Sequence, residues 1–169
     1  MFTWKRLSIS LAAMSVLSAP LLVLADEPKK ETEAKVDDRL VCIGALSGAH
    51  IYTTYGYVGT VADAYAHDIY KADKVQDLMA EVAKLAEVSI GQLKAVRKGN
   101  LDEGDRKVID NVIEVYSLLH DEALALSDYT KSKSQVDLQK FEKARTTAWP
   151  KIKTVLGLKD DPAPSASPK

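Results

Sequence analysis

The amino-acid sequence contains a run of 121 residues without proline, which lies between Pro28 and Pro150. Half of the eight glycines fall in one segment, residues 44–59. Proline and glycine are the residues that most often interrupt a helix. Apolar residues recur at spacings of three and four along the run, and no stretch shows the alternation of Val, Ile and Thr that is typical of a strand. These features predict an all-α protein.

The composition is that of one globular domain. Of 169 residues, 46% are hydrophobic and 28% are charged, which excludes a disordered chain or a collagen. The chain has 23 basic and 24 acidic residues, so its net charge of −1 gives no reason to expect a nucleic-acid partner. Cys42 is the only cysteine, which excludes an internal disulfide, a four-cysteine zinc site and the two-thioether attachment of a c-type haem.

The apolar periodicity after residue 35 divides into four helical stretches. We expect them at about residues 36–71, 74–98, 101–131 and 135–156. Asp73, Asn100 and Ser134 each precede a periodic run, as helix N-caps do, and Gly99 and Gly157 are typical of the ends of the second and the last helix. Joints of only a few residues force neighbouring helices to lie antiparallel. The sequence therefore predicts an up-down-up-down four-helix bundle over residues 36–158, with the last helix kinked at Pro150.

The first 25 residues resemble an export signal. Lys5 and Arg6 provide a positive start, an uncharged and mostly apolar run of 18 residues follows, and Val23-Leu24-Ala25 resembles a signal-peptidase site. Because 18 uncharged residues could also just span a bilayer, an uncleaved membrane anchor is the alternative. We expect cleavage, which would make this an exported protein, periplasmic or secreted, that contacts the membrane only transiently through its signal peptide.

Both ends of the mature chain are predicted to be disordered. Residues 26–35 are mostly charged, and residues 159–169 are rich in Pro, Ser and Asp. Neither composition can bury a hydrophobic core. We interpret the first segment as a linker and the second as a tail.

The predicted first helix is unusual because residues 40–62 contain no Asp, Glu, Lys or Arg. One side of it carries the larger apolar residues and the other carries Gly, Ala and Tyr, so it has no clear solvent face. Three interpretations remain open. The helix is buried on both sides, it presents its small-residue face to a second protomer or to another envelope protein, or it spans a membrane. The residues of the candidate interface are Gly44, Gly48, Tyr52, Gly56 and Gly59.

Arg145 is the main polar anomaly, because it lies at the centre of the apolar face of the last predicted helix. A buried guanidinium group needs a partner or a route to water. We expect Arg145 to pair with Asp68, or with Asp63 if the register shifts by about one turn. Counting levels along antiparallel helices brings six polar residues within a few turns of one another: Asp63, His67, Asp68, Glu81, His120 and Arg145.

This predicted polar cluster has two interpretations. It is a structural layer that fixes the register of the helices, or it binds a small anion at Arg145 or a metal ion at His67, His120 and a carboxylate. Asp63 and His67 favour a metal ion, because they are spaced i, i+4 on one side of a helix. No metal site is assigned on this basis, and no cofactor is expected.

No catalytic motif is found in the sequence. The histidines lack the spacing of a di-iron bundle, and no nucleophile-elbow, phosphate-loop or EF-hand pattern occurs. Cys42 and His50 are interpreted as buried structural residues. We therefore expect a non-enzymatic bundle that acts by self-association as a homodimer, or by contact with another envelope protein, through its first helix. The alternative is a periplasmic sensor or carrier of a metal ion or a small ligand.

The export prediction can be tested at the N-terminus. Cleavage after Ala25 leaves Asp26 as the first residue, so mass spectrometry of the protein from the native cell envelope should find that N-terminus. An intact Met1 would contradict cleavage.

Overall fold

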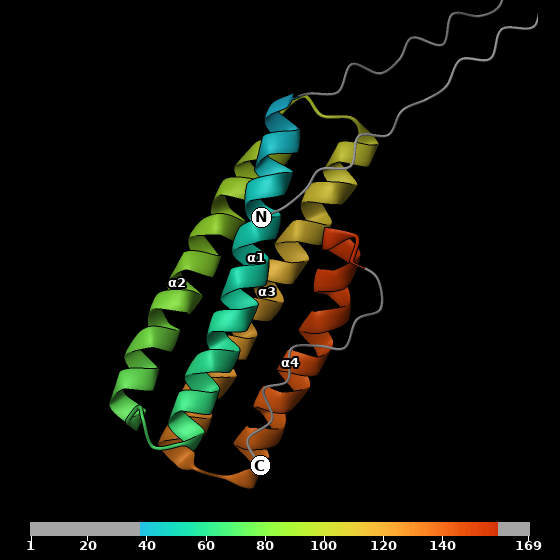
Figure 1. Cartoon of the computed structure of the whole chain (residues 1–169). Coiled ribbons are helices and arrows are strands. Elements are labelled where there is room, and N and C mark those ends of the chain that lie inside the picture. Colours follow the sequence, from blue (N-terminus) through green and yellow to red (C-terminus); the bar gives the residue numbers. More distant parts are fainter. Residues whose placement is uncertain (1–37, 159–169) are drawn as a thin grey trace, which may run out of the picture. The chain divides into compact units, whose positions relative to one another are not determined.

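Residues 38–158 are described by the computed structural model, and they form four α-helices that lie side by side (Figure 1). The helices are α1 (Asp38–Ala66), α2 (Ala72–Arg97), α3 (Glu103–Ser132) and α4 (Gln135–Leu156). No strand occurs within residues 38–158, so the prediction of an all-α fold with four helices is confirmed for them. The predicted signal peptide (1–25), linker (26–35) and tail (159–169) lie outside the described residues.

The other three helices pack on α3. It contacts α1, α2 and α4, and α1 lies in front of it, between α2 and α4 (Figure 1). The buried apolar side chains form two core clusters, each with members from all four helices. The first core cluster includes Ile51, Ala86, Leu119 and Ala148, and the second includes Val58, Met79, Ala123 and Phe141.

Two predicted signals at the ends of α4 are confirmed, whereas the N-caps of α2 and α3 are Lys71 and Asp102 instead of the predicted Asp73 and Asn100. The side chain of Ser134 accepts a hydrogen bond of 3.1 Å from the backbone N–H of Asp137, which makes Ser134 the N-cap. Gly157 ends the helix with a φ of 62°, the left-handed conformation that glycine adopts without strain. Between these ends α4 continues through Pro150, and the kink there stays a prediction.

α1 ends at Ala66, before the predicted residue 71, because Asp68 adopts a left-handed conformation with a φ of 59°. The N–H of Asp68 donates to the carbonyl of Tyr65 over 3.1 Å, and the N–H of Ile69 donates to that of Ala64 over 2.8 Å. This pair of hydrogen bonds is the Schellman pattern, which usually has glycine at the left-handed position. An aspartate there gives little sign of a helix end in the sequence.

The inner side of α1 contains Gly48 and Gly59, which are both buried. A Cβ atom on Gly48 would lie only 2.8 Å from Cδ2 of Leu156 in α4. Glycine at this position therefore lets α4 pack closely on α1 within one chain. The expected interface at Gly48 and Gly59 is corrected accordingly, since neither residue is available to a second protomer.

The outer side of α1 is exposed, so the interpretation that α1 is buried on both sides is wrong. Tyr52 lies on this side, and no atom of a neighbouring element approaches the Cβ position of Gly44, one turn before Gly48, or of Gly56 within 4 Å. Cys42 is also exposed, which corrects the expectation of a buried thiol. Among the described helices, none combines the length and the apolar character that crossing a membrane requires.

Gly48→Leu should destabilise the fold, because the new side chain would overlap Leu156, and overpacking a filled site costs about 1–3 kcal/mol. Gly44→Leu is the matched control. It places the same side chain in open space on the same helix, so it should be neutral or stabilise by up to about 1 kcal/mol. Urea denaturation measures both effects. Equal effects of the two substitutions would show that α4 does not pack closely on Gly48.

Candidate functional site

Arg145 and Glu122 form a buried ion pair between α4 and α3. Nη1 of Arg145 donates to Oε1 of Glu122 over 2.6 Å. Arg145 is 7% exposed, and Glu122 is completely buried. On α3, Leu119 of the first core cluster and Ala123 of the second flank Glu122, so the pair lies where the two apolar clusters meet.

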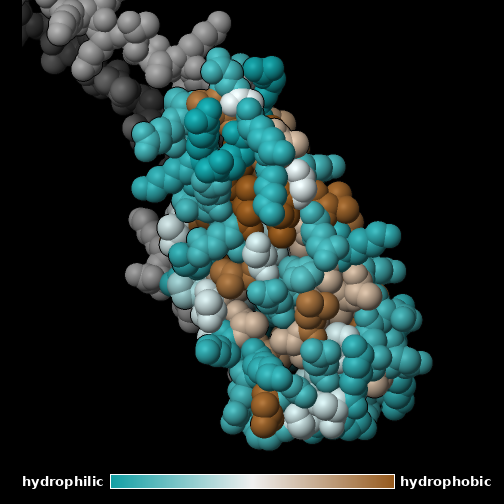
Figure 2. Space-filling view, turned by 180° about the vertical axis from the view of Figure 1, so that it is seen from behind, coloured by the Kyte–Doolittle hydropathy of each residue, from teal (hydrophilic) through white to brown (hydrophobic). Residues whose placement is uncertain are grey.

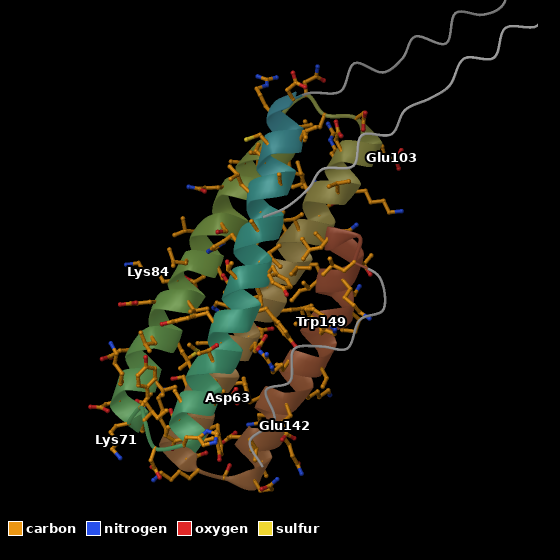
Figure 3. The ribbon with its side chains drawn as sticks, in the orientation of Figure 1. Asp63, Lys71, Lys84, Glu103, Glu142 and Trp149 are labelled. Carbon is orange, nitrogen blue, oxygen red and sulfur yellow. The ribbon has the colours of Figure 1, made fainter. Side chains whose placement is uncertain are left out.

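Arg145 also holds α1. Its Nη1 donates to the backbone carbonyl of Tyr55 over 3.1 Å, and its Cζ lies 4.0 Å from the centre of the Tyr55 ring, which is cation–π geometry. Trp149, one turn further along α4 (Figure 3), stacks on the same ring, with 5.2 Å between the ring centroids. One guanidinium group therefore connects α4 to α3 through Glu122 and to α1 through Tyr55.

The Glu122 carboxyl group is poorly solvated for an ionised group. Burial raises its pKa to about 7, against the Arg145 guanidinium, which lowers the pKa. Oε2 of Glu122 is buried and finds no hydrogen-bond partner among the described residues, and the same holds for Nε1 of Trp149. Burial also raises the pKa of the Tyr55 hydroxyl, although the positive charge of Arg145 lowers it in part. The charge of this site can therefore change near neutral pH.

The predicted pairing of Arg145 with Asp68 or Asp63 is wrong, because its guanidinium group binds Glu122. Asp68 lies in the turn after α1, where its side chain is 93% exposed and Oδ1 is 3.9 Å from Nζ of Lys71. The predicted pairing assumed that the first helix continues to residue 71. Since α1 ends at Ala66, Asp68 is not on the helical face that points to the core.

The other predicted members of the polar cluster are spread over different contacts. Nδ1 of His67 lies 2.8 Å from the backbone oxygen of Asp63, and Nε2 of His120 lies 3.3 Å from Oε1 of Glu87. Glu81 is exposed on α2. No three His, Cys, Asp or Glu side chains within the described residues could together hold a metal ion. This geometry supports neither a metal site at His67 and His120 nor an anion site at Arg145, whose guanidinium group is already engaged.

Glu122 is the site residue that the sequence analysis missed. It lies beside Ala123 and three residues from Leu119, within the apolar stripe of α3, so a charge on that stripe was the available signal. Counting levels with a joint near residue 133 places residue 145 opposite residue 121, one position away. The polar anomaly on α4 thus has its counterpart on α3.

A groove runs between α1 and α2. It consists of two adjoining hollows, of about 500 and 360 Å³, that share His50 and Tyr116. The α1/α2 groove is lined by apolar and aromatic side chains around a polar centre. Its principal lining residues are Leu46, His50 and Tyr57 from α1, Leu78 and Leu85 from α2, and Tyr116 from α3.

The polar centre of the α1/α2 groove is the contact between His50 and Tyr116. Nδ1 of His50 lies 2.9 Å from the Tyr116 hydroxyl oxygen, so His50 has a partner although it is exposed rather than buried as expected. Burial raises the pKa of the Tyr116 hydroxyl, while hydrogen bonds with Ser89 and Ser47 lower it. Three helices thus contribute polar groups to one point of an otherwise apolar groove.

The outer side of α1 is the exposed surface beside this groove. Leu46 and Tyr57, which also line the groove, are 66% and 43% exposed, and Val41 and Tyr52 on the other flank of the helix are exposed as well. No Asp, Glu, Lys or Arg interrupts residues 40–62.

The opposite face of the molecule, where α3 lies in front, is different. Hydrophilic side chains cover most of that surface, and hydrophobic ones gather along its middle (Figure 2).

Comparisons with protein-family models, with curated proteins and with solved structures found no match to this chain.

Arg145→Met should lower the free energy of unfolding by roughly 3–5 kcal/mol above neutral pH, because it leaves the Glu122 carboxylate buried without a counter-charge. The double variant Arg145→Met with Glu122→Leu should recover most of this loss, since it removes both charges. Denaturant unfolding of the single and double variants measures the coupling. Arg145→Met with Asp68→Leu is the matched control and should give additive effects. Additivity with Glu122→Leu as well would contradict the observed pair.

Glu122 should make the fold less stable as the pH rises. The carboxyl group ionises near its ordinary value of 4.5 in the unfolded chain and near 7 in the folded one, so the folded state holds the proton between these values. Relative to Glu122→Gln, the wild type should lose about 3 kcal/mol of stability between pH 4.5 and about 7. Urea denaturation across this range checks the sign. A wild type that gains stability instead would show that attraction to Arg145 outweighs burial.

Proposed function

We propose that this chain is an exported, non-enzymatic helical-bundle protein that acts through protein–protein contact, and that α1 carries its binding face. The uncharged outer side of α1 is the observation that carries the proposal, because Leu46, Tyr52 and Tyr57 are exposed there within residues 40–62. Contiguous exposed apolar surface usually marks an interaction site. The chain as a whole is 28% charged, so this surface departs clearly from the average.

The proposal includes the antiparallel, up-down-up-down arrangement of the helices. Support comes from the ion pairs between neighbouring helices. As the residue number rises along one helix, the number of the partner residue on the next helix falls. These pairs are Glu87 with His120 and Arg97 with Asp110 between α2 and α3, and Glu114 with Lys151 and Glu122 with Arg145 between α3 and α4. In this arrangement the Gly- and Tyr-rich α1 divides its residues between an inner and an outer side.

The α1/α2 groove has dimensions that suit a helix. Its α1 side runs from Ile43 to Tyr57, which is about 21 Å at 1.5 Å per residue. Leu78 and Leu85 of α2 provide apolar contacts along the opposite wall. Laying an apolar helix face into such a groove is a common mode of recognition.

The occupant that fits this face is a second copy of the chain. The outer side of α1 is an uncharged ridge, and Leu46 and Tyr57 on its flank also form one wall of the α1/α2 groove. Two copies related by a two-fold axis each place α1 in the groove of the other, so both surfaces are covered at once. Glu81 is the only acidic or basic side chain (Asp, Glu, Lys or Arg) in the lining of the groove, so self-contact meets little electrostatic repulsion.

Leu46→Glu and Tyr57→Glu should each convert a dimer to monomers, because a charge in an apolar interface must be desolvated without a partner. Sedimentation velocity over a wide concentration range measures the association. Leu124→Glu is the matched control, since Leu124 is 44% exposed on α3 and should leave association unchanged.

A wild type that stays monomeric at every concentration would refute the second copy as occupant. A dimer that survives both substitutions on α1 would refute α1 as the interface. Capture of a different envelope protein by the monomer, lost in Leu46→Glu, would keep α1 as the binding face and replace the second copy by that partner.

A further inference from the structure

A separate cavity lies at the end of the helices where the α1–α2 and α3–α4 joints meet, near Lys71 (Figure 3). This end pocket has a volume of about 380 Å³. Its floor is apolar and includes Leu126 and Phe141, which belong to the second core cluster. The size and the apolar floor are those of a site for a small molecule.

Tyr65 and Tyr129 give the end pocket an aromatic wall. Their ring centroids are 6.1 Å apart, and the rings meet edge to face at 87°. Both residues are half-buried, so the fold holds the rings while part of each remains open to the pocket. Such a wall favours a flat apolar molecule, because aromatic rings stack or meet edge to face with a further ring.

The rim of the end pocket has an unusual backbone. Asp68 and Lys133, with φ of 59° and 52°, are the only non-glycine residues with positive φ in residues 38–158, and both line this pocket. The left-handed conformation is strained for residues with a side chain, and glycine ends α4 in the same conformation at Gly157. A glycine would end α1 and α3 equally well. α1 and α3 thus end on strained residues with charged side chains at the rim of the pocket, although ending a helix does not require a charged side chain there.

The charges at the rim favour an anion. Asp68 and Lys71 face each other at 3.9 Å, and Lys133 forms no ion pair within the described residues. The acidic Asp128 and Asp137 nearby are engaged with Lys131 and Lys140. The lining of the pocket thus has two ammonium groups and one carboxylate, which leaves one positive charge for a ligand.

We propose that the end pocket binds a small aromatic molecule with a single negative charge. The aromatic ring lies against Tyr65 and Tyr129 over the floor of Leu126 and Phe141, and the anionic group reaches the ammonium group of Lys133. This site is independent of the binding face on α1, because none of its lining residues belongs to the α1/α2 groove.

Anilinonaphthalene sulfonate is a suitable fluorescent probe, because it combines flat rings with one negative charge, and the uncharged phenylnaphthylamine is its control. Lys133→Gly should weaken binding of the sulfonate about fivefold, the effect of losing one exposed charge contact, and leave the uncharged probe unaffected. The same variant should raise the Tm, since glycine suits the φ of 52°. Weaker binding therefore cannot come from unfolding. Lys131→Gln, outside the pocket, is the charge-matched control and should bind both probes normally.

Ala66→Trp should block both probes, because Ala66 lines the pocket and is exposed at its mouth. Leu85→Glu, in the α1/α2 groove, should block neither. The proposal is overturned if the sulfonate does not bind, if Leu85→Glu rather than Ala66→Trp abolishes binding, or if Lys133→Gly and Lys131→Gln weaken it equally. If Ala66→Trp does not fold, the comparison of the two lysine variants decides alone.

Discussion

The buried contact of Arg145 with Glu122 is the constraint on which the arrangement of the helices depends. A guanidinium group with 7% exposure is tolerated only where it finds hydrogen-bond acceptors, and Glu122 and the carbonyl of Tyr55 both accept from its Nη1. Because Glu122 is the only buried carboxylate within residues 38–158, sliding α4 along α3 by one turn would leave both charges buried without a counter-charge. The pair therefore fixes register, although its burial costs stability.

The same contact explains why one side of α1 is packed against the other helices. Arg145 and Trp149 hold Tyr55, and Gly48 lets Leu156 approach, so α4 fixes the inner side of α1 by close packing. The opposite side is then left exposed without a charged residue to solvate it. A helix that is anchored from behind and uncharged in front is well suited to contact another helix without unfolding.

The sequence predicted the four helices, Ser134 and Gly157 as the ends of α4, and Arg145 as the polar anomaly, because these depend on local chemistry. It did not predict the end of α1, where Asp68 takes a conformation that favours glycine. Nor did it reveal the sides of α1, since Gly, Ala and Tyr suit both core and surface. Glu122 was missed because its buried state depends on a partner from another helix, which no periodicity along α3 shows.

Amide hydrogen exchange, followed by mass spectrometry in the wild type and in Arg145→Met, tests most directly whether Arg145 holds α1 in place. We expect the amides of α1 around Tyr55 to exchange much faster in the variant, because their anchor on α4 is lost, while α2 and the first half of α3 keep their protection. Unchanged exchange in α1, or an equal loss of protection in all four helices, would contradict this role of Arg145.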